Sequence, residues 1–136
     1  CLAVIVFFCI LQARMARTDL TPPAAAPGLF AEAQATRGDA LYAENCAPCH
    51  RADLAGGDLA PALAGPAFLT RWTGRPLSKL FDYMSAQMPL NSPGGLSAPQ
   101  NADILALMLK KNGYASGRTD LPATTGTLAG ITLQPR

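Results

Sequence analysis

The sequence predicts a single small all-α domain with about three helices joined by long loops. The chain has 136 residues, which is enough for one domain and too few for two. Two segments repeat apolar residues at helical spacing, and a third is rich in alanine, glutamate and glutamine and contains no proline. The stretches between these segments are long and unpatterned, which predicts loops.

The composition excludes several classes of protein. Charged residues make up only 15% of the chain and hydrophobic residues 49%, a balance that argues against disorder. The net charge of +2 is small and the basic residues are scattered, so no nucleic-acid-binding stripe is predicted. Aromatic residues account for only 7%. Such a domain fills its core with small aliphatic side chains, or with something that is not protein.

Residues 1–17 begin with an unbroken apolar run from Leu2 to Leu11. A membrane-spanning helix needs about 20 apolar residues, so the length better fits the apolar region of a secretory signal peptide. Ala13 and Ala16 are small enough to mark cleavage positions. No initiator methionine or basic segment precedes the run, so a membrane anchor truncated at its left end and a buried helix stay open. A Pro/Ala-rich linker is expected over 18–28.

The folded domain is expected over 29–117, and its first helix over 30–44, read as "FAEAQATRGDALYAE". Gly38 inside this helix costs about 1 kcal/mol relative to alanine. A glycine at such a place allows the backbone of another helix to come close. The loop predicted over 51–65, "RADLAGGDLAPALAG", is long enough to be functional and could wrap a ligand.

A second helix is predicted within 74–89, with Pro76 in its first turn and Pro89 at its end. Its apolar residues follow the i, i+3, i+4, i+7 pattern: Leu77, Leu80, Phe81 and Met84. A proline disfavours the helical conformation of the residue before it. Met88 should therefore lie in an extended segment just past the helix.

A third helix is predicted within 97–113, after a turn over 91–95. Ser97 and Gln100 have capping-box spacing, two lysines occupy the last turn, and Gly113 suits the position after the helix. The apolar side consists of Ile104, Leu105, Leu107 and Met108. The C-terminal extension over 118–136 has no helical period, and it either packs as an extended strap or stays loose.

The stretch "NCAPCH" holds Cys46, Cys49 and His50, the only histidine of the chain. A zinc site usually needs four ligands, and no cysteine or histidine follows His50. A thioredoxin-like redox motif belongs at a strand–helix junction of a βαβ unit, and no such strands are predicted. Covalent haem attachment explains all three residues, because two thiols add to the porphyrin vinyl groups and the imidazole binds the iron. The motif therefore predicts one haem c bound through Cys46 and Cys49.

Over 29–117 the chain resembles the class I c-type cytochromes. The resemblance rests on "CAPCH", "PALAG", "FLTRW", "MP" and the closing "ADILALMLKKNG". It implies the small cytochrome c fold, in which helices wrap one haem that fills the core. It also implies that Gly38 and Tyr42 pack against the last helix near Leu107, where the family often has an aromatic residue.

Because no second histidine exists, a methionine is expected as the other iron ligand. The four candidates are Met15, Met84, Met88 and Met108. Met15 belongs to the leader, while Met84 and Met108 lie on apolar helix faces and are expected to be packing residues. Met88 precedes Pro89 in an extended segment, and the axial ligand of the family also stands in a Met-Pro pair. His50 and Met88 are therefore the expected iron ligands.

The resemblance implies further roles around the haem. The carbonyl of Pro61 would accept a hydrogen bond from the ring of His50, which fixes the imidazole and increases its basicity. Leu63 and Phe68 would wall the haem. Trp72, with Arg71 or Arg75, would meet the propionates, although an ordinary buried aromatic residue and solvated cations are the alternative.

His/Met ligation fills all six iron positions, so the expected function is one-electron transfer and not catalysis. The expected donor is a periplasmic dehydrogenase and the acceptor the respiratory chain, through a terminal oxidase. The chain is similar to cytochrome partners or haem domains of quinone-cofactor (PQQ) alcohol dehydrogenases, so a haem subunit or domain of a quinohaemoprotein dehydrogenase is one alternative. A five-coordinate ligand-binding or catalytic haem is another. The protein is expected to be exported, and held at a membrane only if residues 1–17 are retained.

Overall fold

The computed structural model describes residues 28–135 of the chain. The predicted signal peptide or anchor over 1–17, and all of the linker except Gly28, lie outside the described residues. Within residues 28–135, no helix combines the length and apolar character needed to cross a membrane.

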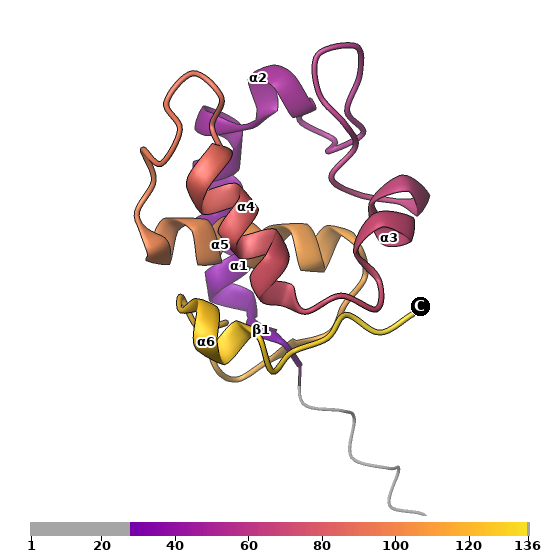
Figure 1. Ribbon diagram of the computed structural model, residues 1–136, viewed down its shortest axis with the longest axis vertical. Coiled ribbons are helices and arrows are strands. Elements are labelled where there is room, and N and C mark those ends of the chain that lie inside the picture. Colours follow the sequence, from indigo (N-terminus) through magenta and orange to yellow (C-terminus); the bar gives the residue numbers. More distant parts are fainter. Residues whose placement is uncertain (1–27, 136) are drawn as a thin grey trace, which may run out of the picture.

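The all-α prediction is confirmed, and residues 28–135 contain three longer helices and three short ones. The longer helices are α1 (Glu32–Asn45), α4 (Leu77–Gln87) and α5 (Ala98–Lys111). The short ones are α2 (Ala47–His50), α3 (Pro66–Trp72) and α6 (Thr125–Leu128). Within the described residues, the sheet consists of β1 (Phe30–Ala31) and β2 (Ser116–Gly117), paired in parallel. In Figure 1, α2 and the loop that follows it lie at the end of the molecule opposite α6.

The crossing of α1 and α5 is the most extensive helix contact in residues 28–135, and Gly38 allows the two backbones to come close. A Cβ at Gly38 would lie 2.0 Å from the backbone oxygen of Asp103 and 3.1 Å from the nitrogen of Ile104. The predicted close approach at Gly38 is therefore confirmed. It is centred on Asp103 and Ile104, one turn before Leu107.

The prediction that the first helix includes Phe30 is wrong. Phe30 lies in β1 opposite Ser116, and its side chain is completely buried. The backbone stays extended here because it hydrogen-bonds to the segment after α5, beginning with Leu29 N–H to the Ala115 oxygen at 3.1 Å. The helix begins at Glu32, whose carboxylate suits a helix N-terminus.

Helices α4 and α5 follow their predicted patterns closely. All four residues of the α4 stripe and all four of the α5 apolar side are buried. The capping box of Ser97 and Gln100 is present, and Gly113 has a φ of 77°. Pro76 immediately precedes α4, so its predicted place in the first turn is wrong by one residue. Met88 is extended, with φ −118° and ψ 153°, as predicted.

Helix α3 was not predicted. It follows Gly65, which has a φ of 82°, and carries Pro66 in its first turn. Its two buried side chains, Phe68 and Trp72, are four residues apart. A helix of seven residues is too short to show a repeating apolar pattern. The proline and the single i, i+4 pair are the signals that could have indicated it.

Of the two alternatives for the C-terminal extension, the packed strap is the one observed. Leu121, Leu128 and Leu133 are almost completely buried. The buried amide of Gln34 in α1 donates to the Leu121 carbonyl at 3.0 Å and accepts from the Leu121 N–H at 2.6 Å. Figure 1 shows the strap running from α6 beneath the helices toward the α3 side of the molecule. The extension is therefore part of the domain core.

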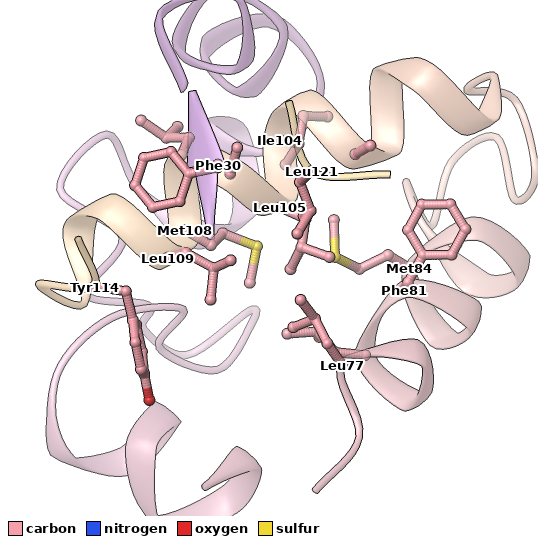
Figure 2. Close-up of a cluster of buried hydrophobic side chains, with 14 of the residues drawn as sticks. Phe30, Leu77, Phe81, Met84, Ile104, Leu105, Met108, Leu109, Tyr114 and Leu121 are labelled. Atoms are coloured by element: carbon pink, nitrogen blue, oxygen red, sulfur yellow. The ribbon is translucent and has the colours of Figure 1, made fainter. Parts of the chain in front are cut away.

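The core centres on residues from α4 and α5. Figure 2 shows Leu77, Phe81 and Met84 of α4 facing the buried side of α5, with Leu121 near Ile104 and Phe30 on the opposite side of the cluster. This packing fixes α4 against α5. Both helices also contribute side chains to the wall of a cavity beside this core.

Candidate haem site

Helix α2 is a single turn built from the Cys-x-x-Cys-His motif itself. Cys46 precedes the helix, and its carbonyl accepts hydrogen bonds from the backbone N–H of Cys49 at 3.2 Å and of His50 at 2.9 Å. Pro48 lies in the first turn, where its missing N–H costs nothing. Residues three and four apart share one face of a helix. The turn therefore brings both thiols and the imidazole to one side.

The imidazole of His50 is buried and held by one hydrogen bond. Its Nδ1 lies 2.8 Å from the carbonyl oxygen of Pro61. A carbonyl only accepts, so Nδ1 carries the proton and Nε2 has the free lone pair. Nε2 has no hydrogen-bond partner in residues 28–135. This tautomer is the one that binds a metal through Nε2.

A cavity of about 480 Å³ opens in front of His50. Its volume is in the range of sites for small molecules and cofactors. All eight residues that the sequence predicted for the haem site line it: Cys46, Cys49, His50, Pro61, Leu63, Phe68, Trp72 and Met88. They come from α2, α3, the loop after α2 and the segment after α4. The structure thus brings the whole predicted set to one place.

The loop over 51–65 forms one wall of the cavity and is ordered by its own backbone. Leu54 is fully buried, and its carbonyl accepts hydrogen bonds from the N–H groups of Leu63 at 2.8 Å and Ala64 at 3.2 Å. The hydroxyl of Tyr42 in α1 donates to the Arg51 carbonyl at 2.7 Å. Burial raises the pKa of the Tyr42 hydroxyl, which keeps it protonated as a donor. The predicted long loop therefore wraps the cavity.

Three methionines line the cavity: Met84, Met88 and Met108. Met84 and Met108 are buried in the core, as expected for packing residues, and they also contribute to the cavity wall. Figure 2 shows both side chains directed into the space between α4 and α5. Met88 differs because it stands outside the helix on extended backbone and is only half-buried.

The two thiols of the motif are free, and the surroundings of Cys46 are unlike those of a reactive cysteine. Burial raises the pKa of the Cys46 thiol to about 11. Reactive cysteines in disulfide oxidoreductases have the opposite shift, toward a lowered pKa. Within residues 28–135, no three His, Cys, Asp or Glu side chains are grouped to hold a metal ion. The pair therefore suits covalent attachment better than disulfide exchange or zinc binding.

Trp72 lies at the cavity edge between two arginines. The guanidinium carbon of Arg71 is 5.4 Å from the centre of the Trp72 ring, and that of Arg75 is 6.0 Å away. Arg71 lines the cavity, whereas Arg75 is not among the lining residues. Of the two arginines considered for the propionates, Arg71 is thus the one placed at the cavity, and that role stays a prediction.

The cavity mouth has a feature that the sequence did not indicate. The large hydrophobic side chains that the structure exposes within residues 28–135 are Leu59, Tyr83 and Leu90, and all three line this cavity. They come from three separate segments, so only the fold brings them together. A haem fits this site, because apolar walls surround two thiols and an imidazole, and methionine side chains complete the lining.

Comparisons with known proteins give a family and a structural relative for this chain. Residues 33–108 match the family model described as cytochrome c oxidase, cbb3-type, subunit III. The crystal structure of the sulfane dehydrogenase SoxCD from Paracoccus pantotrophus is similar, with a TM-score of 0.54 and 30% sequence identity. That similarity covers 73% of this chain and 52% of the other, so the chain spans about half the length of its structural relative. No curated protein matches.

The family match covers more than half of the chain and includes the Cys-x-x-Cys-His motif, the cavity walls and most of α5. The chain therefore belongs to this family of c-type cytochrome domains, which is described as subunit III of the cbb3-type cytochrome c oxidase.

Proposed function

We propose that this chain is a one-electron carrier with a single haem c, attached through Cys46 and Cys49 and ligated by His50 and Met88. The observation that carries the proposal is the shared cavity, in which both thiols, the oriented imidazole and the extended Met88 meet. No second histidine competes for the iron, because the chain contains only one.

The residues of the chain have distinct tasks in this proposal. The Pro61 carbonyl holds the proton of His50 at Nδ1 and so aims Nε2 at the metal position. The apolar side chains of Leu63 and Phe68 exclude water from the site. When bound, the haem supplies a reversible one-electron iron couple, and a thioether ligand raises its potential.

A redox protein is the partner that this function requires. The structural relative is a sulfane dehydrogenase and the family model is named for an oxidase subunit, which supports a dehydrogenase as donor and a terminal oxidase as acceptor. A PQQ-dependent alcohol dehydrogenase is the donor that the sequence resemblance favours. The proposal includes export to the periplasm through residues 1–17.

The mouth of the cavity is the place where we expect electrons to enter and leave. Leu59 and Leu90 are 81% and 77% exposed there, and Tyr83 lies beside the same opening. With a net charge of only +2, the chain offers little long-range steering. The contact with a redox partner would then depend on apolar burial more than on charge.

A second candidate function is that of a haem subunit or domain within a quinohaemoprotein dehydrogenase complex. It is favoured by the length relationship, because this chain matches about half of a dehydrogenase chain. Reduction of the purified protein by the dehydrogenases encoded beside it would support a donor of this class. Failure of every such dehydrogenase to reduce it would count against both forms of the partner proposal.

The ligand proposal is tested with the haem-loaded protein and two variants, Met88→Leu and Met84→Leu. Wild type and Met84→Leu should show the far-red absorption band of a sulfur-ligated ferric haem, and the reduced proteins should bind carbon monoxide slowly or not at all. Met88→Leu should lose the band and bind carbon monoxide readily. A band that survives in Met88→Leu would refute Met88 as the ligand. Rapid carbon monoxide binding by the wild type would favour a five-coordinate iron instead.

A further inference from the structure

The hydrogen bond between His50 and Pro61 depends on a loop without regular secondary structure. Pro61 lies within residues 51–65, where neither a helix nor a strand fixes the carbonyl. Nevertheless its oxygen stands 2.8 Å from Nδ1 of His50. Other contacts must therefore hold this carbonyl in place.

One support comes from inside the loop, at Gly56. Its φ is 68°, and a Cβ there would lie 2.5 Å from the carbonyl carbon of Pro61 and 2.4 Å from the nitrogen of Ala62. The N–H of Gly56 donates to the backbone oxygen of His50 at 3.1 Å. The backbone of Gly56 thus lies directly against the Pro61–Ala62 peptide and is also hydrogen-bonded to His50.

The other support comes from outside the loop, at Asn112. This side chain is 8% exposed and stands at the C-terminal end of α5. Its Nδ2 donates to the Leu63 carbonyl at 3.0 Å and to the Met108 carbonyl at 2.8 Å. Its Oδ1 accepts from the Gly65 N–H at 3.0 Å. Within residues 28–135, no other side chain hydrogen-bonds the backbone of residues 62–65.

Asn112 therefore joins the segment after Pro61 to a helix that also reaches the cavity. Ile104 and Met108 of α5 line the cavity, and Asn112 continues from the turn that carries Met108. The Asn112 amide uses both of its N–H hydrogens and its oxygen in these hydrogen bonds. Both polar atoms of this buried side chain therefore have partners.

We infer that Asn112 is a positioning residue for the axial histidine, acting through Leu63 and the Pro61 carbonyl. The inference rests on the proposed function, in which His50 binds the iron. A firm hydrogen bond from Nδ1–H to a carbonyl makes the imidazole a more basic ligand. A more basic ligand favours ferric iron. Loosening the segment after Pro61 should weaken the hydrogen bond to His50 and make the imidazole less basic, so the reduction potential of the haem should rise.

The test uses the haem-loaded full chain with Asn112→Ala. Two quantities are measured: the solvent exchange rate of the His50 Nδ1 proton by NMR, and the reduction potential. We expect exchange to become about tenfold faster, the factor that corresponds to roughly one hydrogen bond. The potential should rise. Asn112→Ser is a milder second variant than Asn112→Ala. The serine hydroxyl has one donor hydrogen, so it can replace one of the two amide donations but not both.

Asn101→Ala is the matched control. Asn101 is also a buried asparagine of α5, 1% exposed, and its Nδ2 donates to the carbonyls of Leu96 and Ser97 at 3.1 Å each. It makes no hydrogen bond to residues 51–65. Both alanine variants should unfold at lower urea concentration, because each removes the hydrogen bonds of a buried side-chain amide. Only the Asn112 variants should change the proton exchange and the potential.

Equal behaviour of the Asn112 and Asn101 variants in exchange and potential would overturn the inference. It would show that Asn112 stabilises the fold without reaching His50. A different result concerns the proposed function itself: if the His50 ring protons of the wild type show no shift from the haem iron, His50 is not its ligand. That outcome would remove the proposed ligation and this inference with it.

Discussion

The α1–α5 crossing and the haem cavity are built in opposite ways. At the crossing, backbone lies against backbone at Gly38, and Arg37 reaches over the contact to Asp103 at 3.0 Å. At the cavity, loop segments, the two short helices α2 and α3, and side chains of α4 and α5 surround about 480 Å³ that protein does not fill. The crossing is complete with protein atoms alone, whereas the cavity leaves room for the proposed haem.

Helix α5 belongs to both regions. Its backbone at Asp103 receives Gly38, and its side chains at Ile104 and Met108 line the cavity. One helix thus connects the helix crossing to the cavity in which we propose that the haem binds. Substitutions in the two regions should therefore differ in kind: cavity changes alter the haem, and crossing changes alter the free energy of unfolding.

The largest expected effect is the loss of covalent haem from the double variant Cys46→Ala, Cys49→Ala. Without either thiol no thioether can form, so no haem should remain with the protein after denaturation and extraction. Each single variant should retain one thioether. Cys9→Ser, a cysteine outside the motif, should have no effect on attachment. Covalent haem on the double variant would refute the role of the motif.

At the crossing, Gly38→Ala should lower the free energy of unfolding by about 3 kcal/mol, the upper end of overpacking in a well-packed core. The added Cβ would meet the Asp103 carbonyl, a backbone group that cannot rotate away. Urea unfolding of the haem-loaded protein measures the change. Gly126→Ala in α6 is the control, because a Cβ there has nothing within 4 Å. If Gly38→Ala and Gly126→Ala change the free energy of unfolding equally, Gly38 is not needed for the close approach of α1 and α5.

Gln34→Ala should have a smaller effect, about 2 kcal/mol, because it leaves a buried N–H and carbonyl of Leu121 unpaired. It breaks the joint between α1 and the C-terminal strap without touching the cavity. Thr36→Ala, on the exposed side of α1, should change the unfolding free energy by no more than about 0.5 kcal/mol. A changed haem spectrum in Gln34→Ala would show that the two regions are coupled.

The sequence predicted the fold class, and it also singled out residues that the structure brings to one cavity. Cys46, Cys49 and His50 are readable because their chemistry requires fixed spacing, and Met88 because Pro89 forces it out of the helix. Helices α4 and α5 are readable from their apolar periods. These signals are local, so they survive without knowledge of the tertiary structure.

Apart from helix α3, the features that were missed depend on contacts between distant residues. Phe30 leaves the predicted helix because it pairs with Ser116 in a strand. Asn112 looks like an ordinary helix-end residue until the fold places it against Leu63 and Gly65. The apolar rim of Leu59, Tyr83 and Leu90 exists only once three segments converge. No local pattern could have indicated them.

The smallest effect on stability, and the sharpest test of the cavity mouth, is expected from Leu59→Asp. Leu59 is 81% exposed, so the free energy of unfolding should change by no more than about 0.5 kcal/mol. If electrons pass through the mouth, two copies exchanging an electron bring their new carboxylates together. That repulsion, about 1 kcal/mol in water, should slow self-exchange between oxidised and reduced protein by about fivefold.

Salt and a remote charge separate this explanation from a general effect of net charge. NMR line widths of mixtures of the two oxidation states measure the self-exchange rate. Since about 0.1 M salt screens charges beyond roughly 10 Å, added salt should restore much of the Leu59→Asp rate. Thr36→Asp adds the same charge on α1, at a residue that does not line the cavity, and should slow exchange far less. Equal slowing by both variants would mean that the mouth is not the place of transfer, and that the apolar rim has no part in the redox contact.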